Sequence, residues 1–193
     1  MKQPVFLTAL LALVLAVPVG VQAAQRDKGE RVDKAASSSL SRQDKRFIDK
    51  AMQDNNAELA LAKVALEKAQ NAEVKSFAQR LLDDHTKAGS ELEGIVSRLG
   101  YTPPKKAQEK EPRDAQKFAK MSGEKFDREF SKHMVKDHEK AVKLFKDQAQ
   151  DGQSQELWQF AQKTLPTLEE HLRISKQLAG DSGERRERKR KAS

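Results

Sequence analysis

Four long stretches of this chain carry apolar residues at spacings of three and four, and this periodicity constrains the fold more than any other feature. Such spacing keeps side chains on one face of an α-helix, whereas a strand needs alternation at every second residue. The stretches cover roughly residues 43–70, 72–99, 124–150 and 153–179. At ~1.5 Å per residue, each can form a helix about 40 Å long. The sequence therefore predicts an all-α protein built from four amphipathic helices.

The ends of these stretches carry residues that usually delimit helices. Ser41 lies three residues before Asp44 and just ahead of the first apolar stripe, as an N-cap does. Gly100 follows the second stretch and Gly180 the fourth, where a glycine commonly ends a helix. Pro166 lies inside the fourth stretch and removes one backbone donor, so a kink is predicted there.

The segment between the second and third stretches is much longer than the other two connections. It spans residues 100–123 and contains Pro103, Pro104 and Pro112, with one helical turn expected around Phe118. At ~3.3 Å per residue, this segment can travel the full length of a helix. One long crossover between two antiparallel hairpins is typical of the ferritin-like four-helix bundle, which is the predicted fold. A simple up-down bundle with a flexible loop is the alternative.

The first 23 residues have the pattern of a cleaved secretory signal peptide. Lys2 gives a positive start, residues 5–19 are apolar except for Thr8 and Pro18, and small residues precede a cleavage site after about Ala23. An uncleaved anchor is the alternative, although the apolar run is shorter than the ~20 residues that span a bilayer. The chain has no cysteine and no second long apolar run. We therefore expect an exported, periplasmic protein that does not span the membrane after cleavage.

Composition divides the rest of the chain into three parts. Residues 24–42 are polar and Ser-rich, which predicts a flexible leader, and residues 43–180 hold the predicted bundle. Residues 181–193 are predicted to form a basic, disordered tail, because the last ten residues hold six Lys/Arg and two Glu, or +4 of the net charge of +8. Such a tail can hold anionic envelope surfaces, or it is a solvated end. No aromatic residue lies among its basic residues, so no specific nucleic-acid partner is expected.

Each predicted helix carries one polar, metal-capable residue in its apolar stripe. These residues lie near the middles of the helices and are Glu58, His85, His138 and His171. Central positions meet in a packed bundle whichever way the helices point, so the four side chains can converge. Imidazole and carboxylate groups bind Zn²⁺, Cu²⁺ or Fe²⁺. The sequence therefore predicts one candidate site for a transition metal.

Three aspartates are candidates for hydrogen bonds that support these ligands. Asp84 and Asp137 directly precede two of the histidines and point about 100° away from them, toward neighbouring helices. Asp127 lies on the same stripe as His138. All three are predicted to form hydrogen bonds with the ligands rather than to coordinate the metal ion.

Two other interpretations of this polar layer stay open. Buried Glu and His can fix the register of packed helices without binding anything, and histidines can make packing respond to pH.

A di-iron centre is not predicted, because Leu82, Val135 and Leu168 stand three residues before the histidines, where such centres have glutamate. The sequence has no Gly-rich phosphate loop, nucleophile elbow or haem-attachment motif. Nothing in it indicates an enzyme, and no catalytic residue is assigned.

The order of these motifs resembles a known family. Its most specific parts are the Asp-His pairs at 84–85 and 137–138 and the Leu-Pro-x-Leu-x₂-His-Leu segment at 165–172. The other shared residues are Phe47, Glu58, Phe77, Ala78, Phe126 and Asp127. Over residues 44–179 the chain resembles the exported bacterial ferritin-like family called domain of unknown function 4142, often labelled predicted outer membrane protein. The resemblance implies no established activity. It implies a ferritin-like bundle with characteristic positions at Glu58, His85, Asp127, His138 and His171.

Two functions fit these patterns best, and a third, a redox enzyme, would need an open coordination site and activity with peroxide or oxygen. The first is a periplasmic bundle that binds one transition-metal ion, for metal handling or stress protection. The second is a non-enzymatic interaction or scaffold protein of the envelope, whose His/Glu layer is purely structural. The presence of bound metal distinguishes them.

Overall fold

The protein is helical throughout the part that the structure describes. The structure is a computed structural model that describes residues 40–109 and 113–192, without the side chains of 181–189 and 192. The predicted signal peptide (1–23) and most of the predicted leader (24–42) lie outside these residues. The long helices are α2 (Arg42–Lys68), α3 (Ala72–Arg98), α5 (Gly123–Asp151) and α6 (Gln155–Ala192). Between α3 and α5 lie η1 (Lys105–Gln108), a 3₁₀ turn, and α4 (Arg113–Ala119). The predicted all-α fold is confirmed.

Helix ends form where nearby groups satisfy free backbone donors and acceptors. The Ser41 hydroxyl accepts a hydrogen bond from the Asp44 N–H, and the Asp44 carboxylate accepts one from the Ser41 N–H, which is a capping box. Gly100 has a φ of 62° after the end of α3. This left-handed conformation lets the next N–H bond back to the carbonyl of Val96 at 3.2 Å. Both ends are therefore formed by the residues that the sequence indicated.

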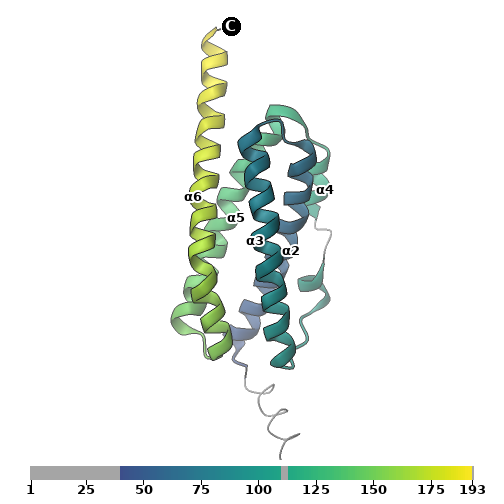
Figure 1. Ribbon diagram of the computed structural model, residues 1–193, viewed down its shortest axis with the longest axis vertical. Helices are drawn as coiled ribbons and strands as arrows, with labels where there is room; N and C mark the ends of the chain where they lie inside the picture. The colour runs from purple at the N-terminus through teal and green to yellow at the C-terminus, as the bar shows by residue number, and fades with distance from the viewer. Residues whose placement is uncertain (1–39, 110–112, 193) are drawn as a thin grey trace, which may run out of the picture.

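The four long helices surround a common interior, and each contacts two others (Figure 1). The short connection at 69–71 makes α2 and α3 antiparallel. Asp44 at the start of α2 accepts a hydrogen bond from Gln148 near the end of α5, so these two helices are also antiparallel. Likewise, Arg98 at the end of α3 donates to Glu156 at the start of α6. It follows that α3 and α5 run in the same direction, and the segment between them travels the length of the helices.

The connection between α3 and α5 packs along α2 through η1 and α4 (Figure 1). At its start, the Tyr101 hydroxyl donates a hydrogen bond to Asp49 of α2 at 3.0 Å. At its end, Phe118 of α4 is buried, with its ring edge-on to Phe126 at a centroid distance of 5.9 Å. The connection is thus anchored at both ends, and α4 contains the helical turn predicted around Phe118.

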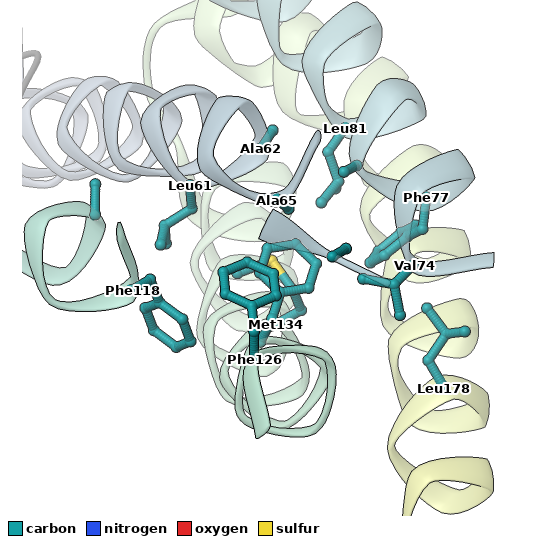
Figure 2. Packing of buried hydrophobic residues seen from close by; sticks show 14 residues of the cluster. Leu61, Ala62, Ala65, Val74, Phe77, Leu81, Phe118, Phe126, Met134 and Leu178 are labelled. Atoms are coloured by element: carbon teal, nitrogen blue, oxygen red, sulfur yellow. The ribbon is translucent and has the colours of Figure 1, made fainter. Parts of the chain in front are cut away.

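Two apolar clusters fill the interior, one toward each end of the helices. The first joins the end of α2 and the start of α3 to α4 and the start of α5, with Leu178 of α6 (Figure 2). In Figure 2, Phe118, Phe126 and Met134 gather beneath Leu61 of α2. The second cluster joins the opposite ends of α2, α3 and α5 to the start of α6. Glu58, His85, His138 and His171 lie between the two clusters.

The helices form two hairpins, α2–α3 and α5–α6, and a buried aspartate in each hairpin accepts hydrogen bonds from the turn of the other. Asp127, near the start of α5, accepts hydrogen bonds from the backbone N–H groups of residues 70 and 71 at 3.1 and 3.0 Å. Asp44, near the start of α2, accepts them from residues 153 and 154 at 3.2 and 3.3 Å. These reciprocal bonds fix the height of one hairpin against the other. They therefore also fix which residues meet in the middle.

The last helix is longer than the sequence predicted. We expected it to end at Gly180, with a disordered tail over residues 181–193, but α6 continues through Pro166 and Gly180 to Ala192. Gly180 lacks the positive φ that Gly100 adopts, so no left-handed cap ends the helix there. Figure 1 shows the final turns of α6 extending beyond the other helices. None of the helices in the described residues is long and apolar enough to cross a membrane.

Candidate metal centre

Three of the four predicted ligands come together in the middle of the molecule. His85 of α3, His138 of α5 and His171 of α6 are all buried. One ring nitrogen of each lies within 4.8 Å of those of the other two. The histidines meet because each lies on the inward stripe of its helix, at the level between the two apolar clusters. The sequence prediction placed these three residues correctly on the interior face.

The ring nitrogen of each histidine that faces away from the cluster has an acceptor. His138 Nδ1 donates to the backbone carbonyl of Met134 at 3.0 Å, one turn earlier in α5. His171 Nε2 donates to the carboxylate of Asp84 at 2.9 Å. His85 Nδ1 donates to the side-chain oxygen of Asn55 at 3.2 Å. In a neutral imidazole the other nitrogen then carries a lone pair, so three lone-pair nitrogens remain inside.

The inner nitrogens lie close to one another. His138 Nε2 and His171 Nδ1 are 3.3 Å apart, within hydrogen-bond distance. His85 Nε2 is buried and has no partner among the described residues. Two lone pairs at 3.3 Å repel each other unless a proton or a metal ion lies between them. Metal–nitrogen bonds of ~2.0–2.1 Å at a tetrahedral angle place two nitrogens about 3.3 Å apart, which matches the His138–His171 pair, whereas the three nitrogens as a set lie within 4.8 Å of one another.

Burial keeps the three histidines neutral at physiological pH. It lowers the pKa of His138 to about 4, with a further contribution from neighbouring His171. Burial, together with the other two imidazoles, lowers the pKa of His85 well below its usual range. Burial also lowers the pKa of His171, although Asp84 opposes the shift. A proton is therefore disfavoured between these rings, whereas a metal ion requires the neutral form that they adopt.

The fourth predicted ligand, Glu58, is buried nearby but lies outside the three-histidine set. Its Oε1 is 3.9 Å from His138 Nδ1, which is the nitrogen that faces away from the other histidines. Its Oε2 is buried and has no hydrogen-bond partner within the described part of the chain. Burial raises the pKa of Glu58 well above its usual range, and the charges of Asp137 and Asp54 raise it further. As arranged here, Glu58 lies beside the cluster rather than among its three nitrogens, and its burial favours the protonated form.

The three predicted supporting aspartates have different positions. Asp84 does what the sequence suggested, because it accepts the hydrogen bond from His171. Asp137 instead pairs with His133 and Lys140, both at 2.9 Å. Asp127 does not reach the cluster, since its two oxygens bond the turn between α2 and α3. The position of a residue on the apolar stripe could not distinguish these roles. It shows which face of the helix carries the side chain, but not which residue that side chain contacts.

The sequence also matches a known protein family. Residues 29–178 match the sequence model of a family described as Domain of unknown function (DUF4142). The chain belongs to this family. This DUF4142 chain is also similar to the crystal structure of a DUF305 fragment from Deinococcus radiodurans, with a TM-score of 0.63 and 20% identity, over 74% of this chain and 98% of that one. At that identity the likeness shows the helical fold alone. No curated protein matches the sequence.

Sequence reasoning missed two residues of this DUF4142 centre, Asn55 and Gly89. Asn55 holds His85, and its amide lies so close to Gly89 that a Cβ there would be 2.5 Å from Asn55 Nδ2. Gly89 therefore makes room for the amide one turn after His85. A signal was present for the first residue, because Asn55 interrupts the apolar stripe one turn before Glu58. No sequence signal pointed to Gly89, because glycine occurs inside helices for many reasons.

Proposed function

We propose that this protein binds one transition-metal ion through His85, His138 and His171, in metal handling or stress protection. The observation that carries the proposal is the convergence of three neutral ring nitrogens while every opposite nitrogen is held by an acceptor. Metal-binding histidines in proteins have this arrangement, because the outer hydrogen bond fixes the ring and its tautomer. Imidazole ligands suit Zn²⁺, Cu²⁺ and Fe²⁺.

We propose further that the fold is the ferritin-like version of the four-helix bundle. Support comes from the parallel directions of α3 and α5 and from the single long connection between them, which contains η1 and α4. A bend of α6 at Pro166 belongs to the same proposal, since proline removes a backbone hydrogen bond inside a helix.

Export to the periplasm is proposed from the sequence of the first 23 residues. The intact mass of the protein recovered from the cell envelope of a bacterial host tests it. A chain that starts near Ala24 is expected, and a full-length chain in the cytoplasm would contradict the proposal.

The metal site is tested by replacing two of its ligands. Purified without an affinity tag, the wild-type protein is expected to bind one equivalent of Zn²⁺, Cu²⁺ or Fe²⁺. Its thermal midpoint should rise on titration, because saturation at 1,000 times Kd adds about 4 kcal/mol of stability. The double variant His85→Ala, His138→Ala should lose both the bound metal and the rise. Elemental mass spectrometry and thermal unfolding measure these effects.

His133 provides the matched control for this experiment. It is the remaining histidine of the chain and pairs with Asp137 outside the cluster. His133→Ala should bind metal as the wild type does. If the wild type and the double variant bind equally, the cluster is a structural polar layer, and the envelope scaffold becomes the better explanation.

Gly89→Ala separates a metal-supporting role of Asn55 from a purely structural one. The substitution should push the Asn55 amide away from His85 and weaken metal binding about 10- to 100-fold, as losing a supporting hydrogen bond does. Stability of the metal-free protein should change little, because the gain of about 1 kcal/mol from alanine in a helix offsets the loss of the hydrogen bond between Asn55 and His85. Isothermal titration and urea unfolding measure the two effects.

Gly94→Ala is the control for Gly89→Ala. Gly94 lies in the same helix, and a Cβ there makes only an ordinary contact of 3.6 Å with Arg98. The control should gain helix stability without changing metal affinity. Equal metal affinity in the two variants would contradict the role assigned to Asn55.

A further inference from the structure

A cavity of about 260 Å³ adjoins the three histidines. Its polar side includes all three rings and Glu58, and its apolar side includes Leu92, Leu144, Phe145, Phe160 and Leu168. Charged side chains also line the cavity: Asp54, Asp84, Glu109, Asp114, Asp137, Lys50 and Lys140. A water molecule occupies about 30 Å³ in the liquid, and drug-sized ligands need roughly 300 Å³ or more. The cavity therefore has room for several waters or for one small molecule of a few atoms, next to the inner ring nitrogens.

Within the described residues, the polar groups beside the cluster are engaged at the outer ring nitrogens, which leaves one side of a bound ion unfilled. Asp84 and Asn55 are engaged with the outer nitrogens of His171 and His85. Glu58 lies at the outer nitrogen of His138. A tetrahedral metal held by three histidines has a fourth position, and sites that keep this position open exchange ligands there. In this protein the cavity is what adjoins that position.

Glu58 is placed to contact a ligand in the cavity. Its side chain is 7% exposed, it lines the cavity, and its Oε2 has no partner among the described residues. A buried oxygen without a partner is unfavourable, and a ligand within the cavity would supply one.

Charge determines the kind of ligand. A divalent ion on three neutral imidazoles brings a charge of +2 into a buried site. The Asp84 carboxylate at the outer nitrogen of His171 offsets part of this charge, and a monoanion at the fourth position reduces the remainder. We infer that the metal ion proposed above keeps an exchangeable position open to the cavity, where a small monoanion binds. This inference rests on the proposed metal function and adds the ligand class of the site.

Cobalt(II) and azide test the inference on the full chain. Cobalt substitutes for zinc in nitrogen sites, and its visible absorption reports the number and type of its ligands. The cobalt-loaded protein should change its spectrum saturably with azide, at one azide per cobalt. No cobalt binding would overturn the metal function itself. Bound cobalt with a spectrum indifferent to azide would overturn only the open position and show that the protein supplies a fourth ligand.

One pair of variants locates the azide. Ala141 lines the cavity one turn after His138, whereas Ala149 lies farther along α5 and does not line it. Ala141→Leu should weaken azide binding at least tenfold while cobalt stays bound, and Ala149→Leu should leave it unchanged. Equal azide affinity in the two variants would overturn the assignment, and circular dichroism checks that each variant is folded.

Discussion

Replacing Asp44 by alanine is expected to lower the free energy of unfolding by about 3–5 kcal/mol. Asp44 is 1% exposed, and its Oδ1 accepts hydrogen bonds from Gln148 Nε2 at 2.8 Å and from the backbone of residues 153 and 154. Its Oδ2 accepts from the Ser41 hydroxyl at 2.7 Å. Alanine would leave these donors without an acceptor, and charge-assisted bonds are about twice as strong as neutral ones. Urea unfolding at pH 7 measures the loss.

Asp147→Ala is the matched control for the Asp44 prediction. Asp147 lies near the same end of α5, but it is exposed and pairs with Lys143 on the surface. An exposed ion pair contributes less than about 1 kcal/mol. If Asp44→Ala costs no more than Asp147→Ala, the bonds between the hairpins do not stabilise the fold as argued.

Acid is expected to destabilise the metal-free protein between pH 6.5 and pH 4, with about 3 kcal/mol of the loss from His138 alone. The unfolded chain takes up a proton at the ordinary histidine pKa of 6.5, whereas burial keeps His138 neutral in the folded state down to about 4. Protons therefore bind the unfolded state first. This contribution to stability is fully present above pH 6.5 and is lost as the pH falls. His85 and His171 act in the same direction.

Glu58 acts with the opposite sign. Its raised pKa means that the folded state takes up a proton before the unfolded chain does, so its contribution to stability is present at low pH and is lost as the pH rises. Glu58→Gln should therefore lose stability more steeply on acidification than the wild type, and His138→Gln less steeply. Urea unfolding across this pH range, with a chelator present, measures the slopes. Equal slopes in all three proteins would show that the cluster does not titrate as its burial requires.

Much of the fold could be predicted because it depends on local patterns. The spacing of apolar residues identified all four long helices, and the Ser41 capping box and the left-handed Gly100 mark two of their ends. Gly180 was a wrong end for α6. A glycine ends a helix only when its backbone turns left-handed, and the residue type permits that turn without requiring it.

The candidate centre could be predicted only in part. A histidine on an apolar stripe faces the interior, which correctly placed His85, His138 and His171. The stripe does not determine which ring nitrogen faces inward, because the partners that orient each ring come from other turns or other helices. For this reason Glu58 was grouped with the histidines, although it lies at the outer nitrogen of His138. Asp127 was likewise grouped with them, although it holds a turn at one end of the molecule.

The sequence alone determined the helical class, the inward faces and the residue types that lie between the two apolar clusters, because helix periodicity relates each residue to its neighbours along the chain. Tertiary structure decided the height and rotation of one helix against another. Those depend on bonds between distant segments, such as that of Asp44 to the turn between α5 and α6. A shift of one residue moves a side chain by about 1.5 Å along a helix and by about 100° around it. Only the packed molecule could therefore bring three ring nitrogens together and turn Glu58 away from them.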